Sequence, residues 1–514
     1  MLIVDVVTTR RDSLHKQWRR LLSLPMAHRL ASGASWSVIG AILSRGMAFA
    51  STVITARVLG KTAFGEYAAV QGTIIMFQSF AGLALGVTAT KHVAEYREND
   101  PAKAGRLIAL SSGVASVSGL VFAVVMGAIA PWLAGRTLAA PHLETSLRIA
   151  AASLFFVSMN SAQLGVLCGM EAFKSMAVFN GIIGIVGFPL VVGGALVGGV
   201  EGATWGTMFA SVAAYLLARF VLKRAARRLN IPISTQGCLR EWPTIWTFAV
   251  PSVVASFSVA PVLWVANALL VNQRDGYAEL GIFNAVYRLK QIPEMVASVV
   301  LSPILPVLSQ MRGSQDAARY NQVLCAAFVL SIVIVAPMAL MLTASPWAIT
   351  TLYGRDYEVT PQLVQLLMLH SIAVGLSAPM TAVIASVGRM WVGAVNNLAY
   401  GVIYLLLAYV LVPAHRAVGL AIASTAAYAV VGCCCFLYIY RHERQWFGRA
   451  PLKELACITA CLYTACVTAS WMLSQPLAGA VGVLAACAFA GASIYVVAKR
   501  HTLRLASVQF ANVG

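Results

Sequence analysis

The sequence predicts an all-α polytopic membrane protein with about fourteen transmembrane helices. Of its 514 residues, 59% are hydrophobic and only 11% are charged, and the mean hydropathy is +0.79. Soluble domains carry about 25% charged residues. A spanning helix needs about 20 consecutive apolar residues, and uncharged stretches of that length recur along the whole chain. These observations exclude a soluble globular protein.

The uncharged stretches define the expected spans and leave only short loops between them. In chain order the spans are 35–59, 67–88, 107–130, 147–168, 176–197, 203–222, 246–271, 280–308, 323–342, 363–387, 392–412, 417–440, 455–473 and 477–497. Residues 1–30 form a basic tail before the first span. In this tail Leu14, Trp18, Leu21 and Leu22 would share one face of a short helix lying on the membrane surface; the alternative is a disordered tail.

Basic residues are distributed unequally between the two sides of the membrane. Of the 37 Lys and Arg residues, 27 fall in the two termini and the loops on their side, 7 on the other side, and 3 within spans. Because cytoplasmic loops are enriched in Lys and Arg, both termini are predicted to be cytoplasmic and the number of spans even. The net charge of +19 is therefore mainly an orientation signal, and no nucleic-acid partner is expected.

An internal repeat divides the chain into two parts of similar topology. Three short segments recur in order at offsets of 213 to 217 residues: 65–70 with 281–286, 177–180 with 394–397, and 211–215 with 424–428. We predict an N-lobe at 31–230 with six spans, a C-lobe at 240–445 with six, and a helix pair at 450–500. Parallel repeats of this kind handle substrate between the halves near mid-depth.

Arg45 is the clearest candidate for a functional residue in the N-lobe. It lies about ten residues into the first span, or about 15 Å deep at 1.5 Å per residue. Buried charges of this kind usually face a polar cavity or a partner. The small and polar residues Ala48 and Thr52 share its helical face and favour a water-filled cavity. The alternative is a structural ion pair with Glu66.

The eighth span supplies the candidates in the C-lobe. Asn284, Arg288 and Gln291 share one helical face and are expected to line the cavity. Lys290 points the opposite way and has Glu294 four residues on, so this pair either neutralises itself or joins the site. The planar guanidinium binds phosphate or carboxylate through two hydrogen bonds. Two arginines, one from each lobe, predict an anion-binding site.

Ion coupling and catalysis give weaker signals. Glu66, Glu294 and His370 are candidate proton carriers by location, although a lone histidine in a span is also a common structural residue. The cysteines lie mainly in apolar runs without zinc-like spacing, so neither metal nor cofactor is expected. No Ser/His/Asp or Cys/His arrangement and no P-loop stands out. An enzyme is not expected.

A short motif between the first two spans resembles a known family. Leu59-Gly60 followed by Phe64-Gly65-Glu66-Tyr67 is similar to the LG-x3-FG-x-Y signature of Wzx-like polysaccharide flippases in the MOP exporter superfamily. Further similarities are residues 303–309, residues 352–357, and the glycine-rich entries to spans 6 and 12. The resemblance covers about residues 30–445.

The resemblance implies two six-helix lobes that open alternately to the two sides of a bacterial inner membrane. They would move an undecaprenyl-diphosphate-linked oligosaccharide outwards for O-antigen, exopolysaccharide or capsule synthesis, in contact with membrane lipids, a polymerase and other assembly proteins. Spans 13 and 14 would form a groove for the lipid tail. One rival is a multidrug (MATE-type) antiporter, which uses membrane-embedded carboxylates that spans 1 and 7 lack. The other is a polysaccharide polymerase, which needs a sizeable outer loop.

Overall fold

In the computed structural model, all regular secondary structure in the described part of the chain is helical. That part comprises residues 25–82, 85–242, 259–301, 317–344, 346–442, 452–472 and 477–489, with 304, 307, 308 and 492. The main helices are α2 (Pro25–Ala81), α3 (Leu85–Tyr96), α4 (Pro101–Trp132), α5 (Glu144–Gly169), α6 (Phe173–Arg228), α8 (Ala260–Val271), α9 (Gly276–Leu301), α11 (Ala317–Thr343), α12 (Trp347–Tyr353), α13 (Pro361–Ser386), α14 (Met390–His442) and α15 (Leu452–Met472). A further short apolar helix spans Leu477–Phe489, and η1 (Leu133–Thr137), η2 (Pro141–Leu143) and η3 (Cys238–Glu241) lie in loops.

Three of the longest helices each contain two predicted spans joined by a sharp break. Non-helical backbone interrupts α2 at Gly60, α6 at Gly198–Gly199 and α14 at Arg416. The turn in α6 is tight enough that a Cβ on Gly194 would lie 2.1 Å from the carbonyl oxygen of Gly202, so only glycine fits there. We call the end of the molecule that carries these turns the Gly60 end.

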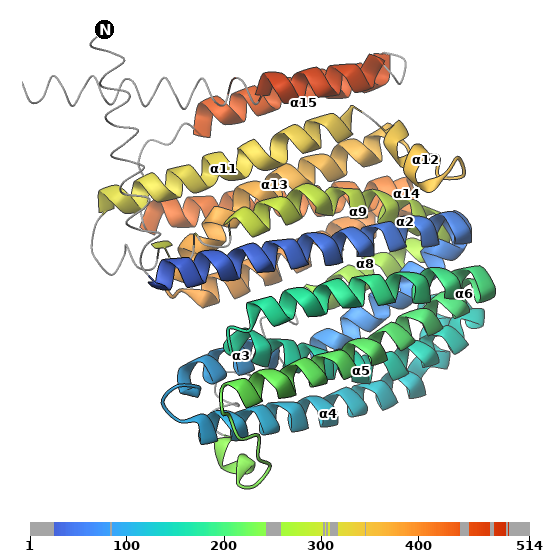
Figure 1. Ribbon diagram of the computed structural model, residues 1–514. Coiled ribbons are helices and arrows are strands. Elements are labelled where there is room, and N and C mark those ends of the chain that lie inside the picture. The colour runs from blue at the N-terminus through green and yellow to red at the C-terminus, as the bar shows by residue number, and fades with distance from the viewer. Residues whose placement is uncertain are drawn as a thin grey trace, which may run out of the picture.

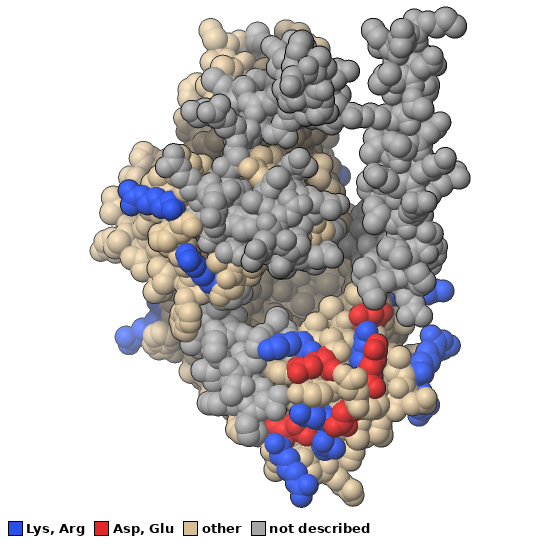
Figure 2. Space-filling view, turned by 90° about the vertical axis from the view of Figure 1, so that its left-hand side faces the viewer, with Lys and Arg blue, Asp and Glu red and all other residues tan. Residues whose placement is uncertain are grey.

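The opposite end carries the start of α4, where the Asp100 side chain accepts a hydrogen bond from the backbone N–H of Lys103 at 2.9 Å. This is an N-cap followed by proline at the first helical position. We call it the Asp100 end. Figure 2 views this end and shows Lys, Arg, Asp and Glu side chains gathered together on it. Arg106 Nη2 lies 2.9 Å from Glu241 Oε1, which ties the loop after α6 to α4.

Six of the described helical stretches are long and apolar enough to cross a membrane. The all-α polytopic fold is therefore confirmed, whereas the count of fourteen spans stays a prediction. The basic tail before residue 25 and the first half of the seventh span, before residue 259, lie outside the described residues. The fourteenth span is described only over Leu477–Phe489.

The helices form two groups that lie side by side with parallel axes (Figure 1). Helices α3 to α6 lie in one group, which with α2 we call the N-lobe. Helices α9, α11, α13 and α14 lie in the other, which with α8 we call the C-lobe. Helix α2 packs against α9 and α8 and so forms much of the boundary between the lobes.

A reciprocal contact joins the lobes near the Gly60 end. A Cβ on Gly65 would lie 1.8 Å from the Tyr277 carbonyl oxygen, and a Cβ on Gly281 would lie 2.0 Å from that of Lys61. Gly281 lies 216 positions after Gly65, and Tyr277 lies 216 positions after Lys61, so the two contacts are equivalent in the repeat. A two-fold axis produces such paired contacts. The contact therefore supports the internal repeat predicted from sequence.

The C-terminal helices pack on the outside of the C-lobe. Cys466 of α15 and Phe489 form a buried cluster with Ile332 and Leu340 of α11. The Tyr463 hydroxyl of α15 also donates a hydrogen bond of 2.6 Å to the carbonyl oxygen of residue 365 in α13. These contacts place the pair on one lobe, away from the boundary with the other.

Candidate functional site

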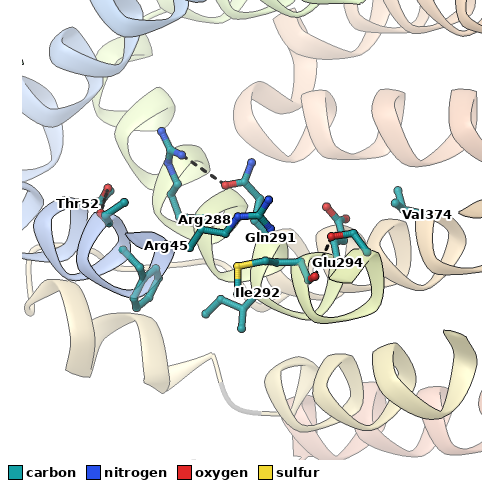
Figure 3. Close-up of a pocket in the computed structure, with 11 residues that line it drawn as sticks. Arg45, Thr52, Arg288, Gln291, Ile292, Glu294 and Val374 are labelled. Atoms are coloured by element: carbon teal, nitrogen blue, oxygen red, sulfur yellow. Dashed lines mark hydrogen bonds between the residues drawn. The ribbon is translucent and has the colours of Figure 1, made fainter. Parts of the chain in front are cut away.

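A cavity of about 530 Å³ lies at the boundary of the lobes. Figure 3 shows that α2 contributes one wall and α9 the facing wall, with α13 alongside. The lining combines arginine and neutral polar side chains with apolar ones. The lining residues are Arg45, Ala48, Phe49, Thr52, Arg288, Gln291, Ile292, Glu294, Met295, Ser298 and Val374.

Arg45 stands on the face of α2 that lines this cavity. Ala48 and Thr52 follow it at helical spacing and line the cavity too, as the sequence pattern predicted. The Arg45 side chain is exposed and makes no ion pair within the described residues. Glu66, the alternative partner, instead has its Oε1 atom 2.9 Å from Nε2 of His142 near the Gly60 end. The structural pairing of Arg45 with Glu66 is therefore wrong.

Arg288 and Gln291 face Arg45 from α9. Arg288 Nη1 donates a hydrogen bond of 3.4 Å to Gln291 Oε1, which orients the guanidinium within the cavity wall. Asn284 was expected beside them but is not among the lining residues; its Nδ2 donates to the Leu280 carbonyl at 2.9 Å. Four residues, or about 6 Å along the helix axis, separate Asn284 from Arg288. The cavity wall therefore ends between these two residues.

Lys290 and Glu294 form an ion pair behind the cavity wall. Their Nζ and Oε1 atoms are 3.2 Å apart, and the Lys290 side chain is only 2% exposed. The ammonium also lies 4.4 Å from the centre of the Tyr287 ring, a cation–π contact. Lys290 is thus turned away from the cavity, whereas Glu294 is 19% exposed and lines it. Among the described residues of the lining, Glu294 is the only carboxylate.

His370 lies in α13 next to this ion pair. It is buried, and neither ring nitrogen has a hydrogen-bond partner within the described part of the chain. Its ring centre is 5.0 Å from that of Tyr428 in α14, and its neighbour Ser371 approaches the Lys290 backbone carbonyl at 3.5 Å. The structure therefore brings two of the three coupling candidates together, at Lys290, and leaves Glu66 apart.

Contacts between the lobes close the Gly60 end beyond the cavity. Arg57 donates hydrogen bonds to two carbonyl groups in the last turn of α12. The Tyr357 hydroxyl, in the loop after α12, donates one of 2.9 Å to the Ala56 carbonyl. Also from the C-lobe, the Tyr277 hydroxyl of α9 donates one of 2.6 Å to the Leu138 carbonyl of the N-lobe. These contacts separate the cavity from the Gly60 end.

Sequence reasoning missed this closure and part of the lining. Arg57 counts in the sequence only as an outer basic residue, and Tyr357 only as part of a motif. Phe49, Ile292 and Met295 add an apolar side to the cavity, which hydropathy alone could not distinguish from lipid-facing surface. The result is a cavity with two arginines that no carboxylate pairs among the described residues. It is suited to an anion that also carries uncharged parts.

Residues 30–312 match the model of a protein family described as "Polysaccharide biosynthesis protein". The matched segment covers more than half of the chain and includes both cavity arginines. The chain belongs to this family. The match confirms the resemblance that the sequence motifs indicated.

Relatives and solved structures agree with membership of the Polysaccharide biosynthesis protein family. The chain is 24% identical to the "EPS I polysaccharide export inner membrane protein EpsE" of Ralstonia nicotianae, over 79% of this chain and 92% of the relative. It is 23% identical to the "Lipid III flippase" of Escherichia coli, over 81% of this chain and 99% of the relative. The structure titled "Lipid II flippase MurJ, inward closed conformation" aligns with a TM-score of 0.68 at 13% identity, covering 89% and 98%. This last likeness shows the shared fold.

Proposed function

We propose that this protein is a flippase that moves an undecaprenyl-diphosphate-linked oligosaccharide from the cytoplasmic to the periplasmic leaflet of a bacterial inner membrane. The observation that carries the proposal is the cavity that presents Arg45 and Arg288 from opposite lobes. Family membership and the names of the polysaccharide-export and flippase relatives support the same conclusion. The product would be a cell-surface polysaccharide.

The cavity is suited to the polar part of such a lipid. A diphosphate offers several acceptor oxygens, and each guanidinium can donate two parallel hydrogen bonds to them. Neutral groups such as Thr52, Gln291 and Ser298 supply partners for sugar hydroxyls, while the lipid tail stays in the membrane. The reaction breaks no covalent bond, so the protein acts as a transporter and not as an enzyme.

The distribution of basic residues supports an orientation with both termini cytoplasmic. The Gly60 end then faces the periplasm. With that end closed by the contacts around Arg57, Tyr277 and Tyr357, the cavity would load from the cytoplasm. Transport would require these contacts to separate and the lobes to close at the Asp100 end.

The membrane potential favours this direction of transport. Moving one elementary charge across the membrane is worth about 2.3 kcal/mol per 100 mV. A diphosphate with two negative charges therefore gains about 4.6 kcal/mol per 100 mV on leaving a negatively charged cytoplasm. The substrate's own charge supplies part of the driving force.

A multidrug antiporter of the same superfamily is less well supported. Cationic drugs would meet two arginines that no acid pairs among the described residues, and Glu294 is already paired with Lys290 at 3.2 Å. A polymerase would need acid/base groups in an outer site, and the described loops at the Gly60 end are short. A polymerase and other assembly proteins are partners in this proposal, because the flipped repeat unit must be polymerised after transport.

The proposal predicts a specific defect in a strain that expresses variants in place of the native protein. Loss of a charge-assisted hydrogen bond costs about 1.5–3 kcal/mol, so Arg45→Ala or Arg288→Ala should reduce surface polysaccharide at least tenfold. The lipid-linked precursor should accumulate, and lysine should restore export only partly. Arg148→Ala is the matched control, because Arg148 is exposed and pairs locally with Glu144. Wild-type export in both alanine variants at normal protein level would refute the proposal.

A further inference from the structure

The buried cluster of Lys290, Glu294 and His370 has a role that charge pairing alone does not explain. One ammonium and one carboxylate neutralise each other at 3.2 Å, so the ion pair needs no third polar group. His370 is nevertheless buried beside it with both ring nitrogens unpartnered among the described residues. Buried polar atoms without partners are unfavourable, and each one in a native structure calls for an explanation.

Lys290 has one ionic partner on its own helix and a polar side chain, His370, on the neighbouring helix α13. Glu294 holds the ammonium now, and Ser371 approaches the Lys290 backbone carbonyl at 3.5 Å, which fixes α13 against this turn of α9. His370 lies one position before Ser371 and is therefore next to the same turn of α9. An unprotonated ring nitrogen of His370 can accept a hydrogen bond from the ammonium once Glu294 no longer attracts it.

Glu294 connects this buried cluster with the cavity. It lines the same cavity as Arg45 and Arg288 while its Oε1 atom points to Lys290. With Glu294 ionised, the four side chains Arg45, Arg288, Lys290 and Glu294 carry a net charge of about +2. With Glu294 protonated they carry about +3, because the charge of Lys290 is no longer cancelled. An anion in the cavity favours the second state.

We propose that the Lys290–Glu294–His370 cluster is a proton-binding site linked to the anion cavity, in which Glu294 takes up one proton when the diphosphate group binds. A hydronium ion donates the proton to the carboxylate and leaves water. Lys290 then exchanges its ionic contact with Glu294 for a hydrogen bond to His370. By linkage, proton and anion each strengthen the binding of the other. The inference rests on the proposed function, since it assumes that the cavity binds a diphosphate.

The groups around the cluster leave Glu294 as its proton acceptor. Glu294 is the acidic side chain of the cluster, and α11 places no charged residue between positions 323 and 343. A positive charge on His370 would be buried next to the Lys290 ammonium, and both burial and like-charge repulsion disfavour that arrangement. The titratable and charged groups that face the cluster are Arg45 from α2, Tyr287 and Arg288 from α9, and Tyr400, Tyr404 and Tyr428 from α14.

Calorimetry of the purified full-length protein with farnesyl diphosphate tests the linkage. Titrations in two buffers of different ionisation enthalpy at the same pH give the number of protons taken up. The probe's own titration contributes equally to every variant. The wild type should take up about one proton more than Glu294→Gln. As the pH falls by one unit, the affinity of the wild type for farnesyl diphosphate should rise by up to ten times as large a factor as that of Glu294→Gln. Glu294→Gln should bind more tightly than the wild type at high pH.

Further variants separate this role from a structural one. Glu279→Gln changes a carboxylate of the same helix that contacts Arg416 at 3.7 Å near the Gly60 end, and its proton uptake should equal that of the wild type. His370→Gln keeps an acceptor for Lys290 and should retain most of the uptake, whereas His370→Leu should lose it. Size-exclusion and thermal melting establish that each variant is folded.

Two outcomes would overturn the inference in distinguishable ways. Tight binding of farnesyl diphosphate with equal proton uptake in the wild type and Glu294→Gln would remove the proton site and leave the anion site standing. No binding of farnesyl diphosphate by the wild type would remove both.

Discussion

Replacing Gly65 or Gly281 by alanine should open the Gly60 end of the molecule. The new Cβ would lie 1.8 Å from the Tyr277 carbonyl oxygen in the first case and 2.0 Å from that of Lys61 in the second. A carbon and a carbonyl oxygen approach to about 3.3 Å at closest, so the helices must separate by about 1.3–1.5 Å. Overpacking of this kind costs about 1–3 kcal/mol. Because only the closed state contains the contact, this corresponds to about a 5- to 150-fold shift towards the open state.

Distances between spin labels measure this shift directly. Labels at Glu201 and Arg355, which are both exposed and belong to different lobes, report the separation at the Gly60 end in a background without native cysteines. Gly65→Ala and Gly281→Ala should both add a longer distance. Gly72→Ala is the matched control on α2, since its Cβ would meet only Trp264 at 4.0 Å. Distance distributions of the folded Gly65 and Gly281 variants identical to the wild type would refute the reasoning.

Two further changes test the contacts at each end. Arg57→Ala removes hydrogen bonds to the end of α12. It should destabilise the closed state by about 1 kcal/mol and so increase the open population less than the glycine variants do. An unchanged distance distribution would show that Arg57 does not contribute to the closure. Arg106→Ala leaves Glu241 without the guanidinium that lies 2.9 Å away. Because the Arg106 side chain is 30% exposed, the loss of this ion pair should destabilise the attachment of the loop to α4 by about 1 kcal/mol. Trypsin should then cut the loop after α6 about fivefold faster, and an unaltered rate would contradict that.

The sequence was sufficient to predict the helices and the two arginines that define the cavity. Spanning helices are set by a local property, the length of an uncharged stretch, so most helices lie where hydropathy placed them. Arg45 and Arg288 could be paired in advance because a charge in an apolar span needs a polar environment, and the repeat places the two lobes face to face.

Features that depend on the depth of the cavity or on distant carbonyl groups could not be predicted. Asn284 shares a helical face with Arg288, but periodicity gives no depth at which a cavity ends. Arg57 and Tyr357 close the Gly60 end through backbone carbonyls nearly 300 positions away in sequence, and a carbonyl acceptor leaves no signal in residue type. His370 shows its missing partners only once the neighbouring helices are in place.

Reconstitution of the purified protein in liposomes tests the central claim most directly. An undecaprenyl-diphosphate-linked oligosaccharide is enclosed in the inner leaflet, and a glycosidase added outside measures the fraction that reaches the outer leaflet. The account predicts that the wild type exposes the oligosaccharide and that the double variant Arg45→Ala, Arg288→Ala behaves like protein-free liposomes. Translocation by the double variant at the wild-type rate would contradict it.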